Sequence, residues 1–325
     1  MSTGPRHNAS AVAGAAAGAG GTAINGATAI DGSTTVVGII GHPVAHSLSP
    51  AIHNAAFAAL RLNMVYVPLP VLEARVLEAV AGLRALGFRG ANVTMPYKAA
   101  VMPGLDEVSA EARLIDAVNT IVVDGDTLRG FNTDIDGFVL ALHQVEPGSL
   151  TGLRALVLGA GGAARAAALA LVREGGGALT IADRTPAAAE RLVALLRPAY
   201  PGVDYRVVAL DALTPEAVRE ARLIVNATSL GMAEASPGSG GAPAAERHEA
   251  LKVPGVLVDT LRRDHIVYDV VYGKRPTLLL TKARAVGART IDGLSMLVWQ
   301  AASAFELWTG AAAPLDVMRS AATRR

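Results

Sequence analysis

The sequence predicts an α/β protein with about two domains. Three observations support this: a length of 325 residues, an apolar fraction of 51% against 18% charged residues, and short β-branched runs that alternate with Ala- and Leu-rich stretches. The length exceeds that of one typical domain, and the apolar fraction suffices for a large buried core. Repeated alternation of strands and helices is typical of a parallel sheet covered by helices on both faces.

The amino-terminal segment differs in composition from the rest of the chain. Residues 1–33 consist largely of Ala, Gly, Ser and Thr, and they lack the continuous apolar run of a signal peptide. Frequent glycines weaken a helix, and few large apolar side chains are present to be buried. We therefore expect a disordered tail that is dispensable for catalysis.

A first series of elements follows this tail. Strands are expected at residues 36–40, 64–69, 91–94 and 120–123, and helices at 49–60, 73–86 and 135–145. Pro50 suits the first turn of its helix, and Ser49 stands where a residue that caps the helix is expected. Asp124-Gly125-Asp126 is a hairpin turn signal, so the chain should turn back toward Leu128.

A second series starts at Leu153. Strands are expected at residues 154–158, 179–182, 205–208, 223–225 and 266–270, and helices at 162–174, 186–196 and 293–309. Gly310 is the expected stop of the last helix. Residues 234–246 are rich in Gly, Pro, Ser and Ala, and they predict a surface loop.

The overall charge and the absence of cysteine exclude several classes of function. A net charge of +1 gives no electrostatic reason to expect a nucleic acid or a membrane surface as partner. No apolar stretch reaches the roughly 20 residues that span a bilayer. A chain without cysteine has no disulfide, thiolate metal site or cysteine nucleophile, which fits a cytoplasmic location. His42 and His46 lack a third ligand at metal spacing, so no metal is expected.

A glycine-rich loop predicts a nucleotide site in the second series. It follows an expected strand and opens an expected helix, with the sequence Gly159-Ala160-Gly161-Gly162-Ala163. Glycines permit the tight turn and let backbone N–H groups approach a pyrophosphate, as in a Rossmann-type, doubly wound parallel sheet. Asp183-Arg184-Thr185 ends the next strand. A carboxylate there favours the ribose of NAD and an arginine favours the phosphate of NADP, so the two signals conflict.

Lys98 and Asp134 are the candidate catalytic pair. Each follows a strand and stands among Asn and Thr residues, in Asn92-Val93-Thr94-Met95-Pro96-Tyr97-Lys98 and Asn132-Thr133-Asp134. An amine and a carboxylate ahead of a dinucleotide fold suggest proton transfer coupled to hydride transfer. The alternatives are a surface cation for Lys98 and a helix cap for Asp134.

Other polar groups suggest a ligand with a carboxylate and several hydroxyls. Ser47 and Ser49 lie at the expected start of a helix, whose positive end suits a carboxylate. Asn119 joins Asn92, Thr94, Asn132 and Thr133 in a dense set of neutral hydrogen-bonding groups. Such a set suits a polyhydroxylated ligand better than an apolar one.

On these motifs the chain resembles the shikimate dehydrogenase family. The matching segments run in order through residues 36–310: His46-Ser47-Leu48-Ser49-Pro50, residues 92–98, Ala117-Val118-Asn119-Thr120, residues 132–134, residues 159–163, Asn226-Ala227-Thr228-Ser229-Leu230-Gly231-Met232, Asp269-Val270-Val271-Tyr272 and residues 292–300. The resemblance implies reversible, NAD(P)H-dependent reduction of 3-dehydroshikimate to shikimate, a step toward chorismate and the aromatic amino acids. It names a small-molecule partner and allows a homodimer.

The resemblance also implies a domain layout and residue roles. Residues 34–133 and 293–325 would form a substrate domain with a mixed sheet, completed by the returning carboxyl-terminal helices, and residues 134–292 the Rossmann-type domain. Lys98 would be the general acid/base, and Asp134 would orient it. Substrate would be bound by Ser47, Ser49, Thr94, Asn119, Asp134, Tyr272 and Gln300. Cofactor would be bound by Gly159, Ala160, Gly161, Gly162, Ala163, Asp183, Arg184, Thr185, Val270 and Gly293.

The chain departs from the family pattern at the expected cofactor site. NADP-using members usually carry Asn-Arg-Thr and a second arginine, whereas this chain has Asp183 and Ala188 at those places. The resemblance favours NADP(H), and the two departures keep NAD(H) open. Lys274 replaces a common proline. Quinate/shikimate and aminoshikimate dehydrogenases are alternative activities, although Ser49 favours shikimate because quinate users often carry threonine. A non-catalytic dinucleotide sensor would not need Lys98 and Asp134.

Overall fold

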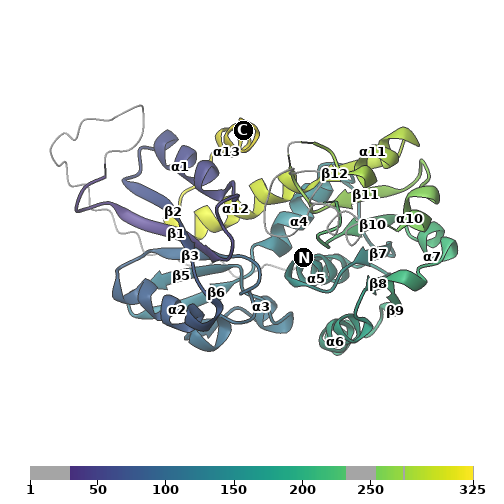
Figure 1. Cartoon of the computed structure of the whole chain (residues 1–325), viewed down its shortest axis with the longest axis horizontal. Helices are drawn as coiled ribbons and strands as arrows, with labels where there is room; N and C mark the ends of the chain where they lie inside the picture. Colours follow the sequence, from purple (N-terminus) through teal and green to yellow (C-terminus); the bar gives the residue numbers. More distant parts are fainter. Residues whose placement is uncertain (1–29, 232–253, 274, 325) are drawn as a thin grey trace, which may run out of the picture.

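The computed structural model describes residues 30–231, 254–273 and 275–324. These residues form two lobes, each built on one six-stranded sheet, with helix α12 running between the lobes (Figure 1). Most of the expected tail (residues 1–29) and the whole expected loop at 234–246 lie outside the described residues. The two-sheet architecture confirms the predicted two-domain α/β fold.

The first lobe contains a mixed sheet. Its strands are β1 (Thr35–Gly41), β2 (Met64–Pro70), β3 (Gly90–Val93), β4 (Glu107–Val108), β5 (Thr120–Asp124) and β6 (Thr127–Phe131), in the spatial order β2-β1-β3-β5-β6-β4. Strands β1, β2 and β3 run parallel, while β5 pairs antiparallel with both β3 and β6. The expected hairpin is confirmed, and Gly125 supplies its positive φ of 56°.

The first lobe contains one short helix that was not predicted, at residues 110–114, and its other helices match the prediction with two differences. The helices are α1 (Ser49–Ala59), α2 (Val76–Ala85) and α3 (Ala110–Leu114), with 3-10 turns η1 (Glu73–Arg75) and η2 (Met102–Gly104). The helix expected at 73–86 is thus split into η1 and α2. The prediction that Ser49 caps α1 is wrong, because Leu48 occupies the cap position and Ser49 is already helical. Instead, the Ser49 N–H donates to Ser47 Oγ at 3.2 Å.

The second lobe contains an all-parallel sheet. Its strands are β7 (Arg154–Leu158), β8 (Ala178–Asp183), β9 (Asp204–Ala209), β10 (Leu223–Asn226), β11 (Ile266–Asp269) and β12 (Arg289–Asp292), in the order β12-β11-β10-β7-β8-β9. The strand order reverses between β7 and β10, so a ligand crevice is expected at their carboxyl ends. The described helices are α4 (Asp134–His143), α5 (Gly162–Arg173), α6 (Pro186–Leu196), α7 (Pro215–Glu220), α10 (Gly255–Asp259) and α11 (Leu278–Ala285), with the turn η3 (Leu210–Ala212).

The last two helices, α12 (Gly293–Thr309) and α13 (Leu315–Thr323), return to the first lobe. Phe305 and Trp308 of α12 share one buried apolar cluster with Val37 and Phe57. Gly310, with φ 69°, ends α12 as predicted. The expected return of the carboxyl-terminal helices is therefore confirmed, and we propose domain boundaries near residues 133/134 and 292/293.

Helices α4 and α12 cross closely at Gly137. A Cβ added there would lie 2.8 Å from the backbone nitrogen of Gln300, which cannot give way as a flexible side chain would. Gly137→Ala is therefore expected to lower the free energy of unfolding by about 1–3 kcal/mol. The control is Gly82→Ala in α2, where an added Cβ meets nothing within 4 Å. That variant should gain about 0.5–1 kcal/mol. Denaturant unfolding measures both, and equal stabilities would contradict the prediction.

Two arginines of α5 hold the second lobe against the first. Arg165 donates to the backbone oxygen of Ile115 at 2.9 Å and lies 3.2 Å from a carboxylate oxygen of Asp116. Arg173, the last residue of α5, pairs with Glu111 of α3 at 2.7 Å and with Asp136 of α4 at 3.0 Å. Helix α5, which follows the glycine-rich segment, is thus tied to the first lobe near both of its ends.

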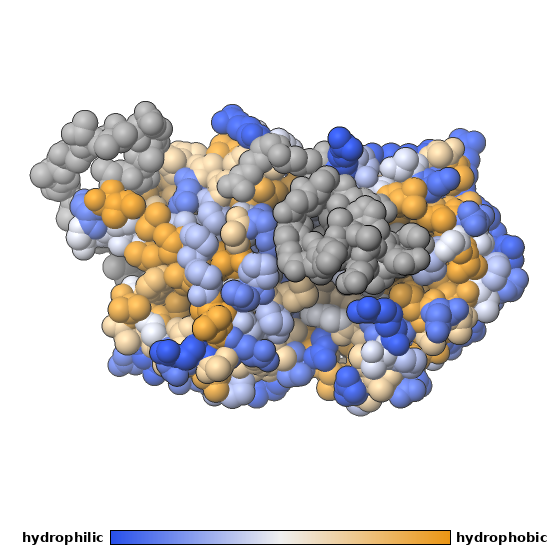
Figure 2. Space-filling model, in the orientation of Figure 1, coloured by the Kyte–Doolittle hydropathy of each residue, from blue (hydrophilic) through white to orange (hydrophobic). Residues whose placement is uncertain are grey.

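The surface has a mixed character. On the face shown in Figure 2, hydrophilic and hydrophobic residues are interspersed over both lobes. The exposed side chains of Leu72 and Leu86 lie at opposite ends of the segment formed by η1 and α2. Scattered exposed apolar residues are ordinary for globular proteins. Within residues 30–231, 254–273 and 275–324, none of the helices is both long enough and apolar enough to span a bilayer.

Candidate active site

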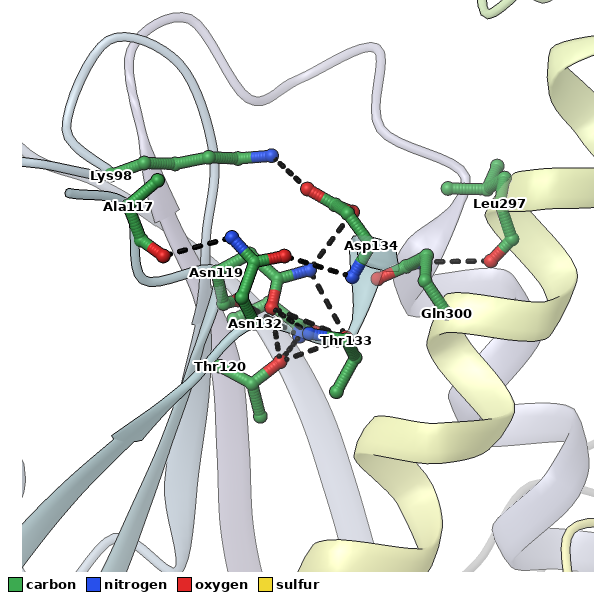
Figure 3. Close-up of polar contacts among 10 residues, drawn as sticks. Lys98, Ala117, Asn119, Thr120, Asn132, Thr133, Asp134, Leu297 and Gln300 are labelled. Atoms are coloured by element: carbon green, nitrogen blue, oxygen red, sulfur yellow. Dashed lines mark hydrogen bonds and ion pairs between the residues drawn. The ribbon is translucent and has the colours of Figure 1, made fainter. Parts of the chain in front are cut away.

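Lys98 and Asp134 form an ion pair between the two lobes. Lys98 lies beyond the end of β3, and Asp134 is the first residue of α4. Lys98 Nζ donates to Asp134 Oδ2, and Figure 3 shows the two side chains pointing toward each other. Their side chains are 19% and 10% exposed, so the pair is partly withdrawn from water. Neither alternative holds: Lys98 is no free surface cation, and Thr133 rather than Asp134 occupies the cap position of α4.

Neutral amides fix the Asp134 carboxylate in place. Asn119 Nδ2 donates to Asp134 Oδ1 at 2.9 Å, so each carboxylate oxygen has its own donor. The backbone N–H of Asp134 donates to Asn132 Oδ1 at 3.1 Å, and Asn132 Nδ2 in turn donates to the oxygen of Ala117 at 2.8 Å. A carboxylate held in this way presents one orientation to a ligand.

Gln300 lies beside this pair, and Thr94, a second candidate substrate residue, lies beside Gly41. Gln300 comes from α12, and Figure 3 places its side chain beside Asp134, while its Nε2 donates to Leu297 O at 2.8 Å. Thr94 follows β3, and its side chain packs where a Cβ on Gly41 would stand. Helix α12 therefore brings a residue some 166 positions after Asp134 (300 − 134) into the same site.

The two serines lie at the start of α1 and are buried. The Tyr66 hydroxyl interacts with the Ser49 side chain and lies near Tyr272. Burial raises the pKa of Tyr66 and of Tyr272 above the usual tyrosine value, so both keep their protons and can donate. The structure thus gathers hydroxyl groups that suit a carboxylate.

The glycine loop has the geometry that a dinucleotide requires. Gly159 adopts φ 102°, a conformation that L side chains rarely adopt, and it follows β7 directly. Gly161 precedes α5, and a Cβ there would meet nothing within 4 Å, which leaves open space beside the loop. The first backbone N–H groups of α5 lack partners within the helix, and no side chain caps them, so they are available to an anion. The loop, which includes Ala160 and Ala163, therefore fits a pyrophosphate.

The candidate cofactor and catalytic groups are in contact. A Cβ on Gly162 would lie 2.8 Å from Cδ of Lys98, so the glycine loop packs directly against the lysine stem. A Cβ on Gly293 would overlap the backbone oxygen of Val270, so these two candidate nicotinamide contacts also adjoin. At Gly293 the overlap is with backbone that cannot move aside, so only glycine permits this approach of the segments after β11 and β12. At Gly162 the neighbour is the flexible side chain of Lys98.

The residues expected to recognise the adenosine ribose lie apart from the ion pair, at the carboxyl end of β8. Asp183 Oδ1 accepts the N–H of Thr185 at 2.7 Å, which fixes the carboxylate in its loop. Arg184 is exposed, and Ala188 lies in the first turn of α6. The loop therefore presents both a carboxylate and a guanidinium.

Three residues that the structure connects to the site were not predicted from the sequence. Tyr66 and Thr120 join the polar network, and His53 lies buried beneath Tyr66 with the two rings stacked at 4.5 Å. The spacing of His53 four residues after Ser49 was the available signal, since such residues share a helix face. His42 and His46 are exposed, and the described part of the chain holds no cluster of three or more metal-ligating side chains.

Comparisons with known proteins agree with this geometry. Family models match residues 39–121 (shikimate dehydrogenase substrate binding domain), 140–233 (shikimate / quinate 5-dehydrogenase) and 293–323 (shikimate 5'-dehydrogenase C-terminal domain). The NADP(+) shikimate dehydrogenase of Methanopyrus kandleri is 45% identical over 289 residues, which cover 88% of this chain and 94% of that protein.

Two solved structures are also similar. The Listeria monocytogenes shikimate 5-dehydrogenase, in complex with shikimate and NAD, has a TM-score of 0.78 and 34% identity over 90% of this chain and 97% of that one. The Thermus thermophilus enzyme, in complex with NADP(H) and shikimate, has a TM-score of 0.74 and 37% identity over 90% of this chain and 99% of that one.

Proposed function

Because the chain belongs to the shikimate dehydrogenase family, we propose that it catalyses the reversible reduction of 3-dehydroshikimate to shikimate. The observation that carries the proposal is the Lys98–Asp134 ion pair packed against the glycine loop. A proton donor, a ligand-orienting carboxylate and a dinucleotide loop at one place are what a carbonyl reduction needs.

The proposed chemistry divides between cofactor and protein. When bound at the glycine loop, the dinucleotide supplies the hydride. Lys98 donates the Nζ proton to the carbonyl oxygen as negative charge develops there, and it takes the proton back in the reverse direction. Asp134 holds the ammonium through Oδ2 and is itself held by Asn119 through Oδ1, so that the proton points at one place.

Substrate is held at two ends. Ser47, Ser49 and Tyr272 would donate hydroxyl hydrogen bonds to its carboxylate, and the positive end of α1 adds to this attraction. At the other end Thr94, Asn119, Asp134 and Gln300 would bind the ring hydroxyls. Two fixed ends orient the ring carbonyl toward Lys98, which is the positioning that accelerates a bimolecular reaction.

The cofactor proposed is NADP(H). Because of Asp183, we expect a weaker preference for NADP(H) over NAD(H) than in relatives that lack this carboxylate. Asp183→Asn is expected to raise kcat/KM with NADP relative to NAD about tenfold, because it removes a negative charge that repels the 2′-phosphate. The control is Asp204→Asn. Asp204 pairs with Ala178 at the amino ends of β8 and β9, whereas Asp183 lies at the carboxyl end of β8. Initial rates with both dinucleotides measure the ratio, and an unchanged ratio in Asp183→Asn would remove that residue from cofactor choice.

A direct assay tests the function itself. Initial rates of shikimate and quinate oxidation are measured with NADP and with NAD, and turnover of shikimate with NADP is expected. Absence of turnover with every pair would overturn the proposal, while faster turnover of quinate would assign the quinate/shikimate alternative. We place the reaction in the cytoplasm on the absence of cysteine, and sedimentation of the purified protein would show whether two copies associate.

A further inference from the structure

Buried hydrogen bonds connect Tyr66 with the Asp134 carboxylate in a continuous chain. The Tyr66 hydroxyl donates to Asn92 Oδ1 at 2.8 Å, and Asn92 Nδ2 donates to Thr120 Oγ1 at 3.0 Å. Thr120 Oγ1 donates to Asn119 Oδ1 at 3.0 Å, and Asn119 Nδ2 donates to Asp134 Oδ1 at 2.9 Å. All five residues are buried, and every donor points toward Asp134.

The two ends of this chain are the two ends of the proposed substrate site. At the Tyr66 end, the hydroxyl also interacts with Ser49. Ser49 belongs to the carboxylate seat, the set of Ser47, Ser49 and Tyr272 proposed to bind the substrate carboxylate. At the Asp134 end, the carboxylate holds Lys98 (Figure 3). The chain runs from β2 past β1 to β3 and on to β5, and it ends at Asp134 in the first turn of α4. Strand spacing therefore sets most of its length.

Backbone groups fix the two amides, and the hydroxyls of the chain complete their hydrogen bonds. The side chain of Asn92 or Asn119 could otherwise rotate by half a turn and exchange its oxygen with its nitrogen. Asn92 Nδ2 also donates to the backbone oxygen of Asn119 at 3.2 Å, and because this oxygen can only accept, it fixes the amide of Asn92. The Tyr66 hydroxyl, which donates to Oδ1, reinforces that orientation and does not set it alone. The backbone N–H of Thr133 also donates to Asn119 Oδ1, at 2.7 Å, so Thr120 reinforces the orientation of Asn119 and does not set it alone.

We propose that Tyr66 and Thr120 are positioning residues, whose hydroxyl groups keep the carboxylate seat and the Asp134–Lys98 pair at a fixed separation. Neither hydroxyl touches the substrate in this proposal, which rests on the proposed function. A substrate that is bound at both ends reacts only when that separation matches its own length. Loss of the Tyr66 hydroxyl should therefore weaken binding at the serine end, and loss of the Thr120 hydroxyl should impair the catalytic pair.

The test uses variants that remove a hydroxyl and keep the shape. Tyr66→Phe retains the ring that stacks on His53 and should raise KM for shikimate about fivefold while changing kcat less than twofold. Thr120→Val should lower kcat about three- to tenfold with little change in KM, and Thr120→Ser should restore kcat. The control is Tyr205→Phe, whose hydroxyl donates only within the second lobe, to Tyr200 O at 3.3 Å.

The outcomes separate this proposal from the proposed function. Thermal unfolding is recorded for each variant, and the expected KM and kcat changes in folded protein support the positioning role. Wild-type kinetics in both hydroxyl-deleted variants, a lower melting temperature without a kinetic change, or no recovery in Thr120→Ser would each overturn it. A wild-type protein that fails to oxidise shikimate would instead refute the proposed function, and this proposal with it.

Discussion

Replacing Lys98 by alanine is expected to lower kcat about 10²- to 10⁴-fold, the usual contribution of a general acid or base. KM for shikimate should change little, because the carboxylate and the ring hydroxyls of the substrate keep their other partners. Loss of the ammonium also removes the donor to Oδ2 of the partly buried Asp134, while Asn119 still donates to Oδ1. Steady-state kinetics on the purified variant measure the effect.

A matched lysine makes this result interpretable. Lys282 is exposed on α11, in the second lobe, and Lys282→Ala should retain the wild-type kcat and KM. A Lys98→Ala variant that kept near-normal turnover would refute the role of Lys98 in proton transfer. Equal losses in the two variants would point to an effect of charge in general.

Stability is expected to fall in acid because of His53. This side chain is fully buried, and neither ring nitrogen has a hydrogen-bond partner among the described residues. Burial lowers the pKa of His53 from 6.5 to about 3. Below pH 6.5 His53 binds a proton in the unfolded chain, whereas in the folded chain it stays neutral until about pH 3. Stability is therefore fully present above pH 6.5 and is lost as the pH falls, by about 1.4 kcal/mol per unit.

Denaturant unfolding at pH 6.5 and pH 5.0 tests this expectation. His53→Phe keeps an aromatic ring against Tyr66 and removes the titrating group. The wild-type protein should lose about 2 kcal/mol more than this variant over that interval. His143→Gln is the control, because His143 is partly exposed and should leave the wild-type loss intact. The same loss in His53→Phe and in the wild type would show that another group is responsible.

The sequence predicted those elements best whose ends carry a chemical signal. Helix α6 begins at Pro186 and α12 ends before Gly310, and both were predicted with their observed bounds. Elements such as β4 and α3 span only two and five residues, too few for a period to show. Helix α11 was also missed, although Thr277 caps it by accepting the N–H of Leu280.

For the site, the candidate residues could be predicted from the sequence, whereas the hydrogen bonds that connect them are seen only in the structure. Lys98 and Asp134 were paired from the unusual polar segments around them, and the structure places them in contact. The part of Tyr66 was not predictable, because a tyrosine in an apolar strand is typical of a core position. Its role depends on which residue lies across the sheet, and strand pairing at long sequence separation cannot be read from local pattern. The roles proposed for the individual site residues remain predictions.

The path of α12 has a consequence for the order in which the protein acquires its structure during synthesis. Residues 30–133 leave the ribosome before the second lobe does, yet Val298, Phe305 and Trp308 complete the cluster that contains Val37 and Phe57. The Rossmann-type lobe is one continuous segment with a large apolar cluster. We therefore expect it to fold before α12 is available to bury the apolar side chains of the first lobe. The lobe that is translated first is thus the one that is finished last.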